Sequence, residues 1–127
     1  MSCLPSRSAA LVCIVDDDPS VCRALRRLVE SAGFSVETFS SGGHALSVGV
    51  VKRAACLIVD VHLGDMTGFQ LKRLLGAEGA KIPTIFITAH DDGPTFESAQ
   101  RAGVAYLPKP IDGDVLLEAI HRAVRGR

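Results

Sequence analysis

The sequence predicts an α/β fold in which a doubly wound parallel sheet of five strands is covered by five helices on its two faces. Two observations carry this prediction: five short apolar segments recur along the 127 residues, and segments with helical periodicity separate them. Strands buried on both faces are nearly continuous in apolar residues, whereas a helix that packs on a sheet carries one apolar stripe. Repeated strand–helix units therefore indicate a parallel sheet between two helical layers.

The predicted strands are short and mostly apolar. They are LVCIV at 11–15, SVETF at 35–39, CLIVD at 56–60, TIFIT at 84–88 and VAYLP at 104–108. Four of them are nearly continuous in apolar residues, which is typical of strands inside a parallel sheet. The second strand alternates apolar and polar residues, and this pattern favours an edge position.

The clearest helices lie near the two ends of the chain. Residues 19–32 carry an apolar stripe, with Asp18 as the predicted N-cap, Pro19 at the first position and Gly33 as the stop. A second strong pattern, capped by Asp112, covers 112–125. The remaining helices are expected at 41–48, at 67–77 and between Pro94 and Gly103.

The composition indicates one domain without a membrane span. We expect a flexible arm at 1–8 and a domain at 9–127. Fourteen basic and fourteen acidic residues cancel, which argues against direct binding of nucleic acid. No apolar stretch approaches the roughly 20 residues that a membrane helix needs. The cysteines lack metal-ligand spacing, and Cys13 and Cys56 lie in apolar runs, so we expect free buried thiols in a soluble, cytoplasmic protein.

Chemically active residue types follow the predicted strands. Ligands of an open parallel sheet bind beyond the carboxyl ends of its strands, and these ends share one edge. The residues expected there are Asp16, Asp17 and Asp18 after the first strand, Asp60 at the end of the third, Thr88 and Ala89 at the fourth, and Lys109 after the fifth.

These residue types favour phosphoryl transfer assisted by a metal ion. Crowded carboxylates repel one another, and Mg²⁺ relieves this repulsion by binding one or two of them together with waters and a phosphate oxygen. We therefore expect Asp16, Asp17 and Asp60 to hold Mg²⁺. Thr88 and Lys109 can donate hydrogen bonds to phosphoryl oxygens, and the Asp60 carboxylate is the natural nucleophile.

Four stretches carry a resemblance to a known family. They are IVDDDPSV at 14–21, LIVDVHLGDMTGFQL at 57–71, ITAH at 87–90 and AYLPKP at 105–110. In this order and spacing, the sequence resembles the receiver domains of bacterial two-component response regulators over about 10–125, and most of all the nitrogen-fixation and nitrate-response type. The resemblance implies a flavodoxin-like sheet with strand order 2-1-3-4-5.

The resemblance also implies a role for each site residue. Asp60 would accept a phosphoryl group from a phosphohistidine on a sensor histidine kinase or phosphotransfer protein. Asp17 would bind Mg²⁺ directly and Asp16 largely through water, with the backbone carbonyl of His62 as a further ligand. The phosphoryl oxygens would be held by Thr88, the Ala89 amide and Lys109.

Signalling would follow from a movement of Thr88 toward the phosphoryl group, which lets Tyr106 swing inward. The face formed by the fourth helix, the fifth strand and the fifth helix would then change its affinity for a downstream protein or output domain, and dimerisation could follow. The Lys109–Pro110 bond is expected to be cis, as in the family.

The sequence departs from the family pattern at Gly64, where many relatives have proline, and a more flexible loop is expected there. His62 and His90 each lie two residues beyond a site residue, at positions that vary in the family. We expect them to influence the lifetime of the phosphoryl group. An alternative is that the two histidines bind a transition metal together with the acids.

Two other functions fit the sequence less well. A phosphatase of the haloacid-dehalogenase type also uses a strand-end Asp and Mg²⁺, but it requires a second Asp where this chain has His62. A degenerate receiver would act only as a protein-binding module, yet every expected phosphorylation residue is present. The absence of a G-x-x-x-x-G-K-[ST] loop disfavours an NTPase.

Several conspicuous residues have ordinary explanations. Asp65 lies in a Gly-rich turn, where Asp is common, and His44 and His121 are expected to face solvent. The first helix, which docks against the kinase in the family, carries Arg23, Arg26 and Arg27. The sequence up to Arg127 contains no DNA-binding or catalytic segment, so a stand-alone receiver and a fragment of a longer regulator are both compatible with it.

Overall fold

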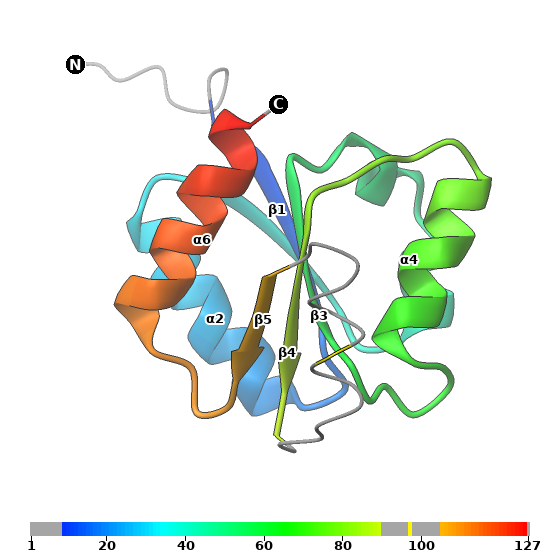
Figure 1. The fold of residues 1–127 in the computed structure, drawn as a ribbon, viewed down its shortest axis with the longest axis horizontal. Coiled ribbons are helices and arrows are strands. Elements are labelled where there is room, and N and C mark those ends of the chain that lie inside the picture. Colours follow the sequence, from blue (N-terminus) through cyan, green and yellow to red (C-terminus); the bar gives the residue numbers. More distant parts are fainter. Residues whose placement is uncertain (1–8, 90–96, 98–104, 127) are drawn as a thin grey trace.

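The computed structural model describes residues 9–89, 97 and 105–126. Its centre is one five-stranded parallel sheet with the order β2-β1-β3-β4-β5, which confirms the predicted fold (Figure 1). The strands are β1 (Leu11–Val15), β2 (Ser35–Phe39), β3 (Cys56–Asp60), β4 (Thr84–Thr88) and β5 (Ala105–Pro108). The predicted edge position of β2 is confirmed.

Helices cover both faces of the sheet. The described α-helices are α2 (Pro19–Ser31), α3 (Gly42–Ser47), α4 (Gly68–Ala77) and α6 (Gly113–Arg125), and a short 3₁₀ helix that was not predicted covers Gly49–Arg53. Helices α2 and α6 lie on one side of the sheet and α4 on the other (Figure 1). The helix predicted between Pro94 and Gly103 and the predicted arm at 1–8 lie outside the described residues, apart from a helical Glu97.

Each face of the sheet has its own apolar core. On one face, side chains of β1 and β3 pack against Leu71 and Leu75 of α4 and Ala45 of α3. On the other, alternate side chains of the same strands pack against α2 and α6 through residues such as Leu25 and Leu116. The two cores explain why the central strands are apolar at every position, since both of their faces are buried.

Local signals in the sequence set the helix boundaries. The Asp18 carboxylate accepts a hydrogen bond from the Ser20 amide at 2.9 Å, and Asp112 accepts from the amides of Asp114 and Val115 at 3.0 and 3.2 Å. Both predicted caps are therefore confirmed. After α2 the chain turns at Gly33, whose φ of +97° favours glycine over other residues.

Outside the site, two cysteines are buried as predicted and two histidines face solvent as predicted. Cys13 and Cys56 are buried, and burial raises the pKa of each thiol to about 12. His44 and His121 are exposed, and they pack against Phe39 and Phe34. No helix among the described residues is long and apolar enough to cross a membrane.

Candidate functional site

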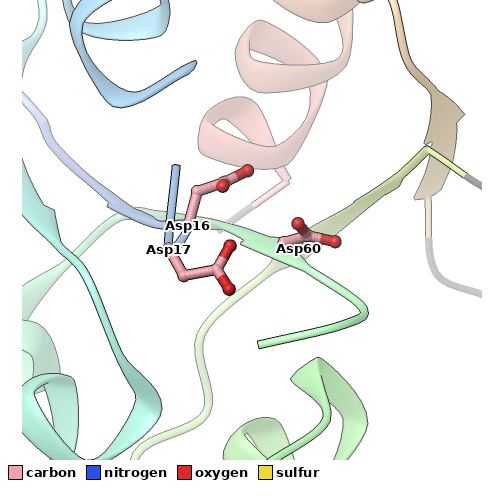
Figure 2. A group of neighbouring side chains, drawn as sticks. All are labelled: Asp16, Asp17 and Asp60. Carbon is pink, nitrogen blue, oxygen red and sulfur yellow. The ribbon is translucent and has the colours of Figure 1, made fainter. Parts of the chain in front are cut away.

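The carboxyl ends of β1 and β3 bring three acidic side chains together. Asp16 and Asp17 directly follow β1, and Asp60 is the last residue of β3. One carboxylate oxygen from each of the three lies within 4.8 Å of the others (Figure 2). The register explains this proximity, because Val15 pairs with Val59 and both strands then reach the edge at the same level.

The three acids differ in exposure. Asp16 is fully buried and Asp60 is 6% exposed, whereas Asp17 is exposed to solvent. The Asp16 amide donates to the carbonyl of Phe39 on β2 at 3.0 Å, and its Oδ1 accepts from the Asp18 amide at 2.8 Å. These bonds fix Asp16 at the base of the site, with Asp17 at its rim.

Lys109 supplies the positive charge of the site. Its ammonium nitrogen lies 2.9 Å from Asp16 Oδ2 and 3.1 Å from Asp60 Oδ2, and only 18% of its side chain is exposed. The Lys109 amide donates to the carbonyl of Thr88 at 2.8 Å, which ties the segment after β5 to the end of β4. The Lys109–Pro110 bond is cis, as the resemblance to receiver domains implies.

The pKa directions show how the charges compete. Burial raises the pKa of the Asp16 carboxyl, and the Asp18 amide and the Lys109 ammonium offset only part of this rise. Burial also lowers the pKa of Lys109, but its contacts with Asp16 and Asp60 outweigh this effect and leave the pKa above its ordinary value. Lys109 therefore stays charged at neutral pH, while the Asp16 carboxylate still lacks full compensation.

The donor set fits a hard divalent cation. All three groups in the cluster are carboxylates, and oxygen ligands suit Mg²⁺. The buried Asp16 Oδ2 lies close to the Lys109 ammonium but makes no well-aligned hydrogen bond, so it has unused capacity as a ligand. Three carboxylates face one ammonium, and an additional cation would lower the repulsion among them.

Histidine does not join this cluster among the residues that the structure describes. The potential ligands within reach of one another are Asp16, Asp17 and Asp60, and His62 has an exposed side chain. The alternative of a transition-metal site built from His62 and His90 therefore gains no support, and His90 lies outside the described residues.

The loop between β3 and α4 closes the site on one side. The His62 amide donates to Asp60 Oδ1 at 3.0 Å, and the Gly68 amide donates to the carbonyl of Val61 at 2.8 Å. A Cβ atom on Gly68 would lie 2.6 Å from the Asp60 carbonyl oxygen. Gly68 is thus a site-forming residue that the sequence analysis missed. The feature of the sequence that could have indicated this role is a glycine directly after Thr67, the residue that caps α4.

Gly64, where many relatives have proline, lies in the same loop and has no structural need for glycine. Gly64 does not adopt a positive φ, and a Cβ atom there would meet only Asp17 Oδ2, at an ordinary contact distance of 3.9 Å. The backbone at this position therefore does not require glycine. Hydrogen bonds within the loop also stabilise it, and in one of them the Leu63 amide donates to the carbonyl of Met66 at 3.2 Å.

Asp65 is more than the turn residue that the sequence predicts. Its two carboxylate oxygens accept hydrogen bonds from the amides of Gly42 and Gly43, at 3.1 and 2.8 Å. These partners lie at the start of α3, more than twenty residues earlier in the chain. The sequence contains no local signal for a contact of this range.

The remaining predicted residues lie on β4 and β5. Thr88 ends β4 and is buried, with Ala89 exposed directly after it. Tyr106 lies on β5 beside Phe86 of β4, is half-buried and packs against the core on the α4 face. Thr88 thus shares the sheet edge with the acids, whereas Tyr106 lies two positions back along its strand, as counted by the pairing of Thr88 with Pro108.

An apolar groove adjoins the site on the α2 side. It has a volume of about 270 Å³ and runs between α2 and the segment that follows Lys109. Its lining residues are Val21, Ala24, Leu25, Leu28, Lys109, Pro110 and Ile111. Lys109 therefore contributes to both the acidic site and the groove.

Comparisons with known proteins agree with this geometry. A family model described as the response regulator receiver domain matches residues 12–121. The response regulator protein TodT of Pseudomonas putida is 40% identical over 121 residues, which is 94% of this chain and 53% of TodT. The transcriptional regulatory protein FixJ of Azorhizobium caulinodans is 35% identical over 90% of this chain and 54% of its own length. The chain thus spans about half the length of these curated relatives.

Solved structures give the same result. The crystal structure of FixJ-N has a TM-score of 0.82 and 34% identity, over 94% of this chain and 97% of that one. The response regulator StyR has a TM-score of 0.80 and 39% identity, over 93% of this chain and 60% of that one.

Proposed function

Because the chain belongs to the family of response regulator receiver domains, we propose that it is a phosphoacceptor switch of a two-component system, with Asp60 as the acceptor. The observation that carries the proposal is the contact of Lys109 with Asp60 at 3.1 Å, inside a cluster of three carboxylates. We assign this function to residues 9–127, as a cytoplasmic domain.

The proposed reaction is a transfer from nitrogen to oxygen. A carboxylate oxygen of Asp60 attacks the phosphorus of a phosphohistidine on a sensor kinase or phosphotransfer protein. The new O–P bond forms as the P–N bond breaks, and the departing imidazole keeps the electron pair. When held by Asp16, Asp17, Asp60 and the His62 carbonyl, Mg²⁺ supplies positive charge that neutralises the phosphoryl oxygens.

Protein groups complete the charge compensation. Lys109 already contacts Asp60, so its ammonium can pair with the phosphoryl group that Asp60 acquires. The Thr88 hydroxyl and the Ala89 amide follow the neighbouring strand and can donate to the remaining oxygens. Hydrolysis of the acyl phosphate by water then returns the switch to its starting state, so the protein acts on its own phosphoryl group and on no outside substrate.

Phosphorylation is proposed to change a surface through Thr88 and Tyr106. The Lys109 amide bonds to the Thr88 carbonyl at 2.8 Å, so a shift at the end of β4 is transmitted to the segment after β5. Tyr106 lies on β5 and packs against the core on the α4 face with its hydroxyl buried, and its ring can respond to such a shift by changing this packing. The face around β5 and α6 would then bind a downstream protein, an output domain or a second copy with altered affinity.

The groove beside α2 is the proposed docking place for the phosphoryl donor. It adjoins Lys109, so a partner bound there lies next to the acceptor. Its floor is apolar, and the exposed Arg23 and Arg27 of α2 offer charge to an acidic partner. Direct binding of nucleic acid is not part of the proposal, because the chain has no net charge.

The test is phosphorylation with acetyl phosphate and Mg²⁺, followed by intact mass. We expect one phosphoryl-sized gain for the wild type and none for Asp60→Ala, with a normal gain for the exposed acid variant Asp114→Ala as a control. A wild type that gains no mass with any donor would indicate a protein-binding module. Rapid turnover of phosphomonoesters would indicate a phosphatase instead.

The same assay addresses the proposed role of His62 in phosphoryl lifetime. His62 is exposed and its backbone amide bonds to the acceptor, so its ring is attached close enough to position or block an attacking water. We expect His62→Ala and His90→Ala to change the rate at which the mass gain disappears. Lifetimes equal to that of the wild type would exclude this role.

A further inference from the structure

Asp65 connects two loops that are distant in sequence. Its Oδ1 accepts from the Gly42 amide at 3.1 Å, and its Oδ2 accepts from the Gly43 amide at 2.8 Å. Both amides belong to the first turn of α3, where backbone N–H groups have no partner within the helix. One exposed carboxylate thus joins the loop after β3 to the helix after β2.

The two glycines permit this close approach. A Cβ atom on Gly42 would lie 2.5 Å from the sulfur of Met66, and one on Gly43 would lie 3.3 Å from Asp65 Oδ2. Any larger residue at position 42 would push Met66 away. The pair Gly42–Gly43 therefore matches the pair Asp65–Met66 in shape as well as in hydrogen bonding. We call this contact the Asp65 clasp.

The charge of Asp65 suits the clasp. The amides of Gly43 and Gly42 lower the pKa of the Asp65 carboxyl below its ordinary value, so the group is ionised at neutral pH. Hydrogen bonds to an ionised acceptor are stronger than those between neutral groups. The clasp is exposed, however, so its contribution is local, and global stability is a poor measure of it.

A short path of bonds leads from the clasp to the acceptor. The carbonyl of Met66, next to Asp65, accepts from the Leu63 amide at 3.2 Å, and Thr67 pairs with His62 in an antiparallel bridge. The His62 amide in turn donates to Asp60 Oδ1 at 3.0 Å. A displacement of Asp65 would therefore reach the segment that carries the His62 carbonyl.

We propose that Asp65 is a positioning residue for the phosphoryl site, and that the clasp holds residues 61–67 so that the His62 backbone is fixed at Asp60. This inference rests on the proposed function, because it assigns the His62 carbonyl to the metal. Loss of the clasp releases the loop at 61–67. The affinity of the site for Mg²⁺ then falls, and the phosphoryl lifetime changes.

The chain offers a matched control on the same helix. The Ser41 hydroxyl caps α3 by accepting from the His44 amide at 3.0 Å, a hydrogen bond that stays within the first turn of this helix. Ser41→Ala therefore weakens the start of α3 and leaves the clasp in place. Asp65→Ala removes both bonds of the clasp, and Asp65→Asn keeps one carbonyl oxygen and loses the charge.

The experiment measures Mg²⁺ affinity by calorimetry on the unphosphorylated full chain, and phosphoryl lifetime by intact mass. We expect Asp65→Ala to weaken Mg²⁺ binding by about tenfold, which is the low end of the effect of groups that support metal ligands. Asp65→Asn should lie between Asp65→Ala and the wild type, and Ser41→Ala should match the wild type. Faster amide exchange at Gly42 and Gly43 in Asp65→Ala checks that the clasp is lost.

The possible outcomes distinguish failure of the positioning role of Asp65 from failure of the proposed phosphoacceptor function. If the wild type binds Mg²⁺ and accepts the phosphoryl group while both Asp65 variants match it in affinity and lifetime, the positioning role is wrong and the proposed function stands. If Ser41→Ala weakens Mg²⁺ binding as much as Asp65→Ala, the effect belongs to α3 and the inference is again overturned. If the wild type neither binds Mg²⁺ nor accepts the phosphoryl group, both proposals fail.

Discussion

The interior and the ends of the central strands are equally buried but differ in chemistry. In β3, Ile58 is fully buried among apolar side chains, and Asp60, two residues later, is only 6% exposed. In β1, Val15 and Asp16 are both fully buried. The interior favours folding because apolar surface leaves water, whereas the end removes charge from water and needs compensation by Lys109 and backbone amides.

This contrast indicates that the two parts of each strand contribute differently. The apolar interior stabilises the sheet, whereas the acidic end lowers the stability of the fold and forms the reactive site. Crowded charges are seldom placed in a fold for stability alone, and they gather where chemistry requires a shifted proton affinity or a bound cation. Substitutions at the two levels should therefore have opposite effects on folding and on phosphorylation.

The largest effect is expected in the strand interior. Ile58→Ala creates a cavity in the core between the sheet and helices α2 and α6, and we expect the free energy of unfolding to fall by about 2–5 kcal/mol. The folded fraction should still accept the phosphoryl group, because Ile58 lies on the strand and not at its end. Urea denaturation measures the loss. Leu74→Ala, at a side chain that is 44% exposed, should change stability by less than about 0.5 kcal/mol.

A smaller effect of opposite sign is expected at the strand end. Asp17→Asn removes one of three neighbouring carboxylates, and in the absence of metal we expect the protein to gain roughly 0.5–1 kcal/mol of stability, since exposure of Asp17 to solvent weakens the repulsion. Mg²⁺ binding should be lost at the same time. Urea denaturation in the presence of a chelator measures the first effect. If Asp17→Asn were less stable than the wild type, the acidic strand end would not lower the stability of the fold. Glu37→Gln on β2 is the control variant outside the cluster.

The smallest effect is expected in the loop that follows the strand end. Gly64→Ala should stabilise the protein by about 0.4–1 kcal/mol, because the native backbone accepts a Cβ atom and the unfolded chain loses freedom. Gly68→Ala provides the contrast, since its Cβ would lie 2.6 Å from the Asp60 carbonyl oxygen, and destabilisation is expected. If Gly64→Ala were destabilising as well, the loop would need flexibility that its contacts do not reveal. Thermal unfolding of both variants measures the difference.

The elements of the fold followed closely from the sequence because their signals are local. Four strands begin and end as predicted, and the fifth, described as Ala105–Pro108, ends at its predicted residue, while its predicted start at 104 lies outside the described residues. The helix α3 is shorter than predicted, since Ser41 is its cap and Val48 is extended. Periodicity and caps act within a few residues, so they can be recognised without knowledge of the rest of the chain.

The membership of the site was predictable for a different reason. Parallel strands place their carboxyl ends at one edge, so Asp16, Asp17 and Asp60 could be grouped before any coordinates were known. The alternation of strands and helices was sufficient for that step. The sequence therefore determined the fold class, the helix caps and the acidic cluster.

Only the tertiary structure decided how this cluster is held. The double contact of Lys109, the approach of Gly68 to Asp60 and the Asp65 clasp each join residues that no periodic pattern connects. Such contacts depend on how two loops pack against each other, and a turn residue such as Asp65 has the same local signal whether or not a distant amide lies nearby. Local chemistry fixes the elements, whereas the distances between their ends are set by the packing of the whole sheet.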